Sequence, residues 1–270
     1  MRIRIALAQI LYDSQIEKNL ESIRAKIEEA KLRTADIVCF PECALSGYGP
    51  AHYTSKEEFK PEEIELAVQE VKNLAQNHEI NVILGTHRLV DGKWLNSAVL
   101  IAGNGRIRGS YDKTHLTSGD NDFYDKGDDV RTFNFAGITV GVQICFDLRF
   151  PELFRLLALE GAQVIFMPTY ACGPRTRWKI SVIEAHVRSR AAENGIFAAI
   201  VNAAGPYMNS PSMVCDPDGL IIAQSNLEIE GLLVAEVNLT QPRRMPDFLK
   251  LRRTDLFNFE RINHKKDSKQ

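Results

Sequence analysis

The alternation of apolar and polar positions predicts a strand, a helix and a second strand at the start of the chain. Residues 2–10, RIRIALAQI, alternate isoleucine and leucine with polar or smaller residues, as a strand does. From Ile16 to Ile27, apolar residues recur every three or four positions, which gives a helix one apolar face. Residues 35–42, ADIVCFPE, then contain an apolar run that ends at Pro41 and is typical of a strand buried on both faces.

The order of helix and strand is repeated once before strand pairs replace it. Apolar residues over 64–74 mark a second amphipathic helix, and residues 81–89 follow as a strand. Two pairs of strand-like runs then turn at Asn104-Gly105 and at Ala136-Gly137. Since Asn-Gly is the strongest short signal for a hairpin, we expect two hairpins in the middle of the chain.

Helices and strands alternate again in the last part of the chain. A helix is predicted from Pro151 to Gly161, because proline is favoured in the first turn and glycine just past the end. A long helix is predicted from about residue 176 to residue 194. A turn is expected at Asp218-Gly219. Apolar runs that predict further strands occupy residues 162–168, 195–203 and 231–239.

These elements form one unbroken series of about ten strands and four long helices. The sequence contains no internal repeat, low-complexity tract or linker rich in glycine, serine or proline, so we expect a single α/β domain. Because β-α units are mixed with hairpins, two layers of sheet with helices outside them are predicted.

Composition and charge exclude several classes of protein. The 270 residues are 44% apolar and 25% charged, as in an ordinary globular protein. The net charge of −2 gives no general attraction to nucleic acid or to an anionic membrane, and no segment has the roughly 18 consecutive apolar residues of a membrane helix. The first residues lack the apolar run of a signal peptide, and the five cysteines are scattered without a CxxC pair. We therefore expect a cytoplasmic protein with reduced thiols and no zinc site.

Three chemically useful side chains stand where predicted strands end. Glu42 ends one run, Lys113 follows another, and Cys145 ends the run GVQIC. Each alone has a plain interpretation, as a solvated turn residue or a buried thiol. Together they suffice for acyl transfer without metal or cofactor, because a carboxylate can deprotonate the thiol and an ammonium can hold an oxyanion.

Sequence blocks around these residues resemble the nitrilase superfamily of carbon–nitrogen hydrolases. The three signature blocks are FPECALSGY, YDKTHL and CFDLRFPELFRLLALEGAQVI, and the segments ALAQI, WKISVIEAHVRSRAAEN and VNAAG also match. The resemblance runs in order from about residue 3 to residue 239. It implies a four-layer α-β-β-α sandwich, with the hydrolase domain over residues 1–240.

The resemblance also implies a role for individual residues. Glu42 is expected to be the general base, Lys113 the oxyanion stabiliser and Cys145 the nucleophile, with the backbone N–H of Phe146 completing the oxyanion site. The family further implies a homodimer or higher homo-oligomer, to which residues 241–270 would contribute as a C-terminal tail.

One family position departs from the usual pattern. Members carry a second glutamate between the lysine block and a Pro-Gly-Asp turn, and the matching position here is Asp120, with Asp122 as a rival. We expect Asp120 to position Lys113 and the bound amide. Tyr48 and Tyr170 are candidates for the pocket wall.

Other polar residues near the blocks receive a structural interpretation. His115 is interpreted as structural rather than as the base, and Asn202 as a residue that ties a loop. Cys172 lies on a loop that lines the pocket in the family, while Arg175 and Arg177 are interpreted as solvated loop residues near the same mouth.

The sequence therefore predicts a hydrolase of non-peptide carbon–nitrogen bonds, most simply an amidase acting on a small linear amide through a cysteine thioester. CFDLRFPE resembles the branch of ω-amidase and deaminated-glutathione amidase. Hydrolysis of a nitrile or of an N-carbamyl amide remains open, as does a catalytically silent scaffold of the family.

Overall fold

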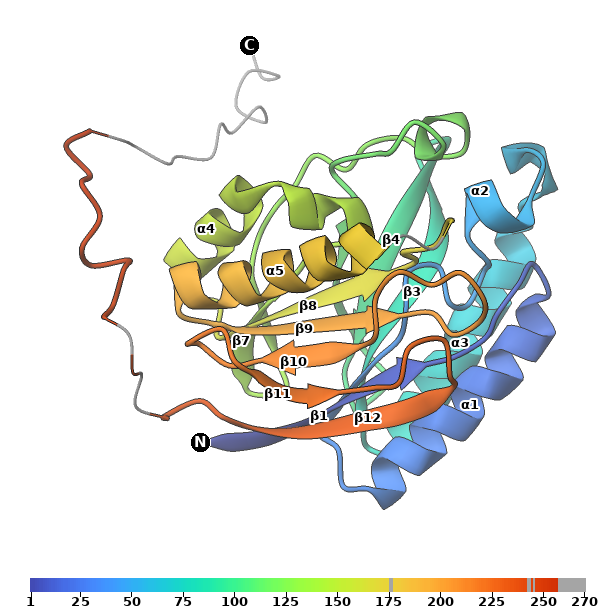
Figure 1. The fold of residues 1–270 in the computed structure, drawn as a ribbon. Helices are drawn as coiled ribbons and strands as arrows, with labels where there is room; N and C mark the ends of the chain where they lie inside the picture. Colours follow the sequence, from blue (N-terminus) through green and yellow to red (C-terminus); the bar gives the residue numbers. More distant parts are fainter. Residues whose placement is uncertain (175–176, 242–243, 245, 257–270) are drawn as a thin grey trace, which may run out of the picture.

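Two β-sheets packed face to face form the centre of the molecule, and the helices lie outside them (Figure 1). The computed structural model describes residues 1–174, 177–241, 244 and 246–256. Each sheet has six strands. The α-β-β-α layering predicted from the sequence is confirmed.

Sheet A is built from the N-terminal half of the chain and closed by its last strand. The strand order is β12-β1-β2-β3-β4-β5, in which β1, β2 and β3 are parallel and the other neighbours are antiparallel. Parallel neighbours need crossover helices, whereas antiparallel neighbours need only short turns. The strands of sheet A are β1 (Arg2–Gln9), β2 (Ile37–Cys39), β3 (Asn81–Val90), β4 (Lys93–Ile101), β5 (Ile107–Asp112) and β12 (Gly231–Asn238).

Sheet B has the order β11-β10-β9-β8-β7-β6, again with three central parallel strands, β7, β8 and β9. The predicted hairpin at Ala136-Gly137 joins β6 to β7, and both turn residues have positive φ, as this type of turn requires. The strands of sheet B are β6 (Phe133–Phe135), β7 (Ile138–Val142), β8 (Val164–Thr169), β9 (Phe197–Asn202), β10 (Met213–Cys215) and β11 (Ile221–Gln224).

Four long helices cover the outer faces of the sheets within the described residues. The crossover helices of sheet A are α1 (Ile16–Leu32) and α3 (Pro61–Asn77), and those of sheet B are α4 (Pro151–Leu159) and α5 (Arg177–Asn194). The predicted bounds of α4 and α5 agree with these to within about two residues, whereas the apolar patterns over 16–27 and 64–74 stop five residues before the end of α1 and three residues inside each end of α3. Shorter helical segments lie in the loops: α2 (Gly49–His52), η1 (Lys56–Glu58), η2 (Asp120–Asp122) and η3 (Cys145–Arg149).

Apolar side chains fill each interface between layers. In β1, Ile5 and Leu7 point into the core between the sheets, while Ala6 and Ala8 face the helices, as the period of a strand requires. The central core combines residues of both sheets, and two further cores lie under the helix pairs. This packing holds the strand ends of the two sheets in fixed positions relative to each other.

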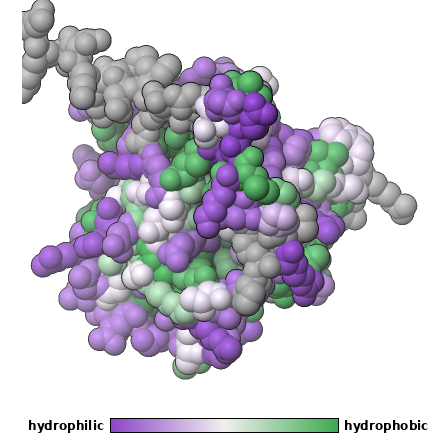
Figure 2. Space-filling model, turned by 90° about the vertical axis from the view of Figure 1, so that its left-hand side faces the viewer, coloured by the Kyte–Doolittle hydropathy of each residue, from purple (hydrophilic) through white to green (hydrophobic). Residues whose placement is uncertain are grey.

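The regular part of the chain ends with β12, and the segment 246–256 lies outside the sandwich, on the side of α4 (Figure 1). Leu249 packs against the apolar core under α4 and α5, whereas Leu251 and Leu256 are 67% and 61% exposed. From the side on which this segment extends, apolar residues gather in a hollow bordered by polar ones (Figure 2). No helix among the described residues is both long and apolar enough to cross a membrane.

Candidate active site

The three residues singled out at strand ends meet across the two sheets. Glu42 follows β2 and Lys113 follows β5 in sheet A, whereas Cys145 follows β7 in sheet B and begins η3. The Lys113 Nζ atom lies 2.7 Å from Glu42 Oε1. The backbone N–H of Tyr170, just after β8, donates to Glu42 Oε2 over 2.9 Å, and the charges of both Glu42 and Lys113 act on the Cys145 thiol. The carboxylate, the ammonium and the thiol therefore share one site.

The Glu42 carboxylate is fully buried and accepts hydrogen bonds at both oxygens. Oε1 accepts from Lys113 Nζ and from Asn96 Nδ2, each over 2.7 Å, and Oε2 accepts from the Tyr170 backbone. Burial raises the pKa of Glu42, and the neighbouring Lys113 charge offsets only part of this effect. A carboxylate with a raised pKa is suited to accept and return protons near neutral pH.

The loop that carries Glu42 packs its backbone directly against strand β3. The carbonyl of Pro41 and the amide of Cys43 lie against Gly85 of β3, where a Cβ atom would be 2.0 Å from the Pro41 oxygen and 2.7 Å from the Cys43 nitrogen. Only glycine leaves room for this loop. Cys43 itself has a φ of 53°, so the chain turns sharply directly after Glu42.

Lys113 is fully buried between two carboxylates. Its Nζ atom donates to Glu42 and, over 2.8 Å, to Asp120 Oδ2. Burial opposes the charge, but Glu42, Cys145 and Asp120 together raise the pKa of Lys113 well above its usual value. The lysine is therefore a permanent cation beside the thiol.

Asp120, rather than Asp122, is the carboxylate that contacts the lysine. Besides Lys113, it accepts hydrogen bonds from the backbone and hydroxyl of Thr117, each over 2.8 Å, and from the Tyr48 hydroxyl over 2.7 Å. Burial opposes its charge, but these contacts outweigh burial and lower the pKa of Asp120. Asp122 is exposed. The side chain of Asp120 thus reaches Lys113 despite being one methylene shorter than glutamate.

Cys145 lies at a sharp turn that we call the nucleophile elbow, residues 144–147. Its φ is 45°, a conformation that non-glycine residues rarely adopt. The sulfur is half-buried and lines a cavity. Burial and then the Glu42 charge raise the pKa of the Cys145 thiol, and Lys113 opposes them only in part. The thiol is therefore protonated at neutral pH and needs a base in order to act as a nucleophile.

The buried carboxylate of Asp147 ties the elbow to the segment that carries the lysine. It accepts hydrogen bonds from the Ile144 backbone over 3.0 Å, the Tyr111 hydroxyl over 2.8 Å, the Thr114 hydroxyl over 3.0 Å and the His115 backbone over 2.9 Å. Tyr111, Thr114 and His115 surround Lys113 in sequence. Asp147 thus joins the loop of sheet B to the loop of sheet A.

A cavity of about 320 Å³ opens beside Cys145. Tyr48 and Tyr170, the two expected wall residues, both line it, and Phe146 is half-buried in its wall. The described lining residues include two cations, Arg149 and Lys179, and no acidic side chain. The other lining residues are Thr117, Cys145, Leu148, Thr169, Ala171, Cys172, Ile183, Ile200 and Asn209.

The polar residues given a structural interpretation have structural contacts where they are described. The His115 ring stacks on Phe150 at 3.6 Å, and the Asn202 side chain joins Ala171 to Ser210. Cys172 is exposed at the cavity. Arg175 and the side chain of Arg177 lie outside the described residues.

Several residues of the site were not singled out from the sequence. Asn96 lies inside β4, where asparagine is disfavoured, and this position was a usable signal. Asp147 lies within the cysteine block and was passed over. Arg149 and Lys179 come from η3 and α5, and no local pattern relates them to each other.

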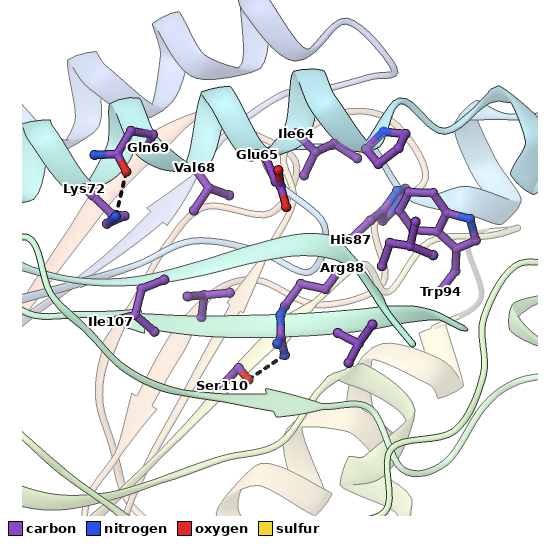
Figure 3. Close-up of a pocket in the computed structure, with 14 residues that line it drawn as sticks. Ile64, Glu65, Val68, Gln69, Lys72, His87, Arg88, Trp94, Ile107 and Ser110 are labelled. Carbon is purple, nitrogen blue, oxygen red and sulfur yellow. Dashed lines mark hydrogen bonds between the residues drawn. The ribbon is translucent and has the colours of Figure 1, made fainter. Parts of the chain in front are cut away.

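A second cavity, of about 430 Å³, lies on the outer face of sheet A, away from the triad of Glu42, Lys113 and Cys145. Ile64 and Val68 of α3 face Ile107 and Trp94 of the strands across it (Figure 3). None of the triad residues lines this cavity. Within the described residues, no group of three or more His, Cys, Asp or Glu side chains is arranged to hold a metal ion.

Comparison with known proteins agrees with this geometry. Residues 4–247 match the family model described as carbon-nitrogen hydrolase. An (R)-stereoselective amidase of Pseudomonas sp is 32% identical over 81% of this chain and 80% of its own length. Omega-amidase NIT2 of Mus musculus is 28% identical over 95% of this chain and 97% of its own.

Solved structures show the same fold. A carbon-nitrogen hydrolase of Helicobacter pylori G27 superposes with a TM-score of 0.84 at 23% identity, covering 95% of this chain and 97% of its own. An amidase of Nesterenkonia sp. gives a TM-score of 0.79 at 24% identity, covering 94% of each chain. The resemblance read from the signature blocks is confirmed, and the chain belongs to the carbon–nitrogen hydrolase family.

Proposed function

We propose that this protein hydrolyses a small linear amide through a thioester on Cys145. The observation that carries the proposal is the buried Lys113–Glu42 ion pair, whose two charges act on the thiol of Cys145, a thiol that needs a base. Relatives named as amidases cover most of this chain. A buried ion pair costs desolvation free energy, so its place beside a cysteine favours a catalytic role over a structural one.

In the first half of the reaction, Glu42 takes the proton of Cys145 while the sulfur attacks the amide carbon. The charge that develops on the carbonyl oxygen is held by Lys113 Nζ and by the backbone N–H of Phe146. Glu42 then gives its proton to the nitrogen, the C–N bond breaks, and ammonia or an amine leaves. The acyl group stays on the sulfur as a thioester.

In the second half, water replaces the amine. Glu42 takes a proton from the water, whose oxygen attacks the thioester carbon, and the same two donors hold the second oxyanion. The C–S bond then breaks, the proton returns to the sulfur, and a carboxylic acid is released. Every proton passes through Glu42, so neither metal nor cofactor is required.

The cations of the cavity support a narrower proposal for the substrate. Arg149 and Lys179 line the cavity without an acidic lining residue to neutralise them. The Nη1 atom of Arg149 contacts only the neutral acceptor Nδ1 of His186, over 3.3 Å, among the described side chains. His186 stays neutral because burial lowers its pKa and the adjacent Arg149 and Arg190 charges lower it further. We propose that these cations hold a carboxylate at the far end of a linear amide.

A screen for ammonia release tests this function. Monoamides of short dicarboxylic acids are compared with neutral aliphatic amides, nitriles and N-carbamyl compounds, with Cys145→Ala as the inactive control. We expect the carboxylated amides to react fastest. Activity that survives in Cys145→Ala would refute the mechanism. Faster turnover of nitriles or of N-carbamyl compounds would show that the protein is a nitrilase or an N-carbamyl amide hydrolase instead.

A matched variant separates the two parts of the proposal. Lys179→Met should raise KM for a carboxylated amide about tenfold, because it removes one charge-assisted hydrogen bond. It should leave KM for a neutral amide unchanged. Equal effects on both substrates would contradict the carboxylate site and leave the amidase reaction intact.

Selective modification distinguishes an enzyme from a silent scaffold. Iodoacetamide should alkylate Cys145 at neutral pH, and Glu42→Gln should slow this reaction, because the thiol depends on the base. No alkylation of Cys145 in the folded protein would favour the scaffold.

We further propose a homodimer to which residues 241–270 contribute, as expected from the family. The exposed Leu251 and Leu256 support this, since apolar side chains on an extended segment favour association. Truncation after residue 240 should reduce the mass measured by light scattering to that of the monomer. The cytoplasmic location stays a prediction.

A further inference from the structure

Asn96 is a fully buried polar residue in the middle of β4, directly beside the proposed base. Its Nδ2 atom donates to Glu42 Oε1 over 2.7 Å. Its Oδ1 atom accepts from the Cys43 thiol, whose sulfur is 3.4 Å away. The amide thus bridges Glu42 and the residue that follows it.

The orientation of this amide is set by its two partners. A carboxylate oxygen can only accept a hydrogen bond, and the thiol can donate one, so nitrogen must face Glu42 and oxygen must face Cys43. The reversed amide would place two acceptor oxygens against each other. Asn96 therefore presents an N–H donor to Glu42 in its only favourable orientation.

The backbone of Asn96 also reaches the lysine. Its carbonyl accepts the Lys113 N–H over 2.9 Å, just beyond the last residue of β5. One residue of β4 thus holds the Glu42 carboxylate through its side chain and the Lys113 backbone through its main chain. The separation of the two charged groups depends on this strand.

The hydrogen bonds of Glu42 differ between its two oxygens. Among the described residues, Oε1 accepts from both Lys113 and Asn96, whereas Oε2 accepts only the backbone N–H of Tyr170, a residue that lines the cavity together with Cys145. Two donors saturate Oε1, so Oε2 is the oxygen left to bind a proton, and it faces the backbone of Tyr170, which lines the cavity beside Cys145.

We propose that Asn96 is the positioning residue of the general base: it fixes Oε1 and thereby directs proton transfer to Oε2, and it lowers the proton affinity of the carboxylate. This rests on the proposed role of Glu42. A hydrogen bond donated to a carboxylate stabilises the charged form, and an amide does so without adding a charge to the site. Asn96 thus offsets part of the rise in the pKa of Glu42 that burial causes.

The test is the pH dependence of Cys145 alkylation by iodoacetamide, followed by mass spectrometry of the modified peptide, which needs no substrate. In the wild-type protein the rate should fall as Glu42 becomes protonated. In Asn96→Ala the midpoint should move to higher pH by about one unit, because one hydrogen bond to the charged form is lost. With a substrate, the acid limb of kcat/KM should shift equally while KM changes little.

Matched variants keep the outcomes separate. Asn194→Ala removes a buried asparagine side chain from the far end of α5 and should leave the midpoint unchanged. If Asn96→Ala does not fold, Cys43→Ala, which frees the amide to rotate, should raise the midpoint by a smaller amount. A wild-type midpoint in the folded Asn96 variant, or in Cys43→Ala where that variant is used, overturns the proposal. Identical profiles for wild type and Glu42→Gln would instead overturn the role of Glu42.

Discussion

Replacing Asp120 by asparagine removes one charge from the buried site while keeping its shape. The asparagine oxygen can still accept from Lys113 and Thr117, which lie 2.8 Å from Asp120 Oδ2. Its NH₂ group would then face the Tyr48 hydroxyl, which can accept a hydrogen bond as well as donate one. The side chains can thus stay in place, and the main change is the lost negative charge next to Lys113.

The magnitude follows from this contact. A hydrogen bond between charged groups contributes about 1.5–3 kcal/mol and one to a neutral acceptor about 1 kcal/mol, so the exchange weakens the interaction with Lys113 by roughly 0.5–2 kcal/mol. If the same loss appears in the transition state, kcat/KM falls about 2- to 30-fold. The charge of Asp120 also raises the pKa of Glu42. Removing it should therefore move the acid limb of the pH profile to lower pH.

Steady-state kinetics over a range of pH on the best amide of the screen measures both effects. Asp122→Asn is the matched control, because Asp122 is exposed only two positions away and its change should leave the kinetics unaltered. A value of kcat/KM for Asp120→Asn equal to that of wild type would refute the positioning role. A shift of the acid limb to higher pH would refute the electrostatic part of the reasoning.

Three other changes have defined outcomes. Asp147→Asn replaces a carboxylate that accepts hydrogen bonds from four groups, and it should lower the free energy of unfolding by about 1–3 kcal/mol. It should also slow the alkylation of Cys145 at the nucleophile elbow. Unaltered reactivity of the thiol would contradict the proposed link between the two loops. Gly85→Ala forces a Cβ atom into the backbone beside Glu42, so it should lower the free energy of unfolding by about 1–3 kcal/mol and remove most of the activity. Gly231→Ala, which has open space at its Cβ position, should change neither the stability nor the activity. Burial lowers the pKa of His87 to about 3, against about 6.5 when unfolded, so only the unfolded chain gains a proton as the pH falls from 6.5 toward 3. In urea unfolding, the free energy of unfolding of the wild type should therefore fall by about 2 kcal/mol more than that of His87→Gln between pH 6.5 and pH 5. Equal decreases in the two proteins would disprove this.

The fold was predictable from the sequence because its elements have strong local signals. The apolar run before Cys145 and the Asn104-Gly105 turn each determine local structure within a few residues. The ends of three such runs also gave the triad positions. Their convergence could only be inferred, because it depends on how the two sheets pack and on backbone contacts such as that at Gly85.

The choice between Asp120 and Asp122 shows why the rest could not be predicted. Both lie in η2, a 3₁₀ turn in which positions two apart are separated by roughly two-thirds of a turn and so point in different directions. One carboxylate is buried against Lys113 and the other is exposed. Sequence spacing gives the distance along the chain but not the direction of the turn. Asn96 has the same difficulty, since its partners lie just beyond the end of β5 and in the loop after β2.

The pairing of β1 with β12 has a consequence for how the protein is made. Arg2 lies opposite Asn238, so β1 leaves the ribosome long before β12, the strand that pairs with its outer edge and closes sheet A. Until then one edge of β1 is unpaired and able to pair with another chain. Sheet B contains only strands that are synthesised before β12. We therefore expect aggregation during synthesis to start at β1, and a chain that ends before residue 231 and has left the ribosome to contain every strand of sheet B beside an unfinished sheet A.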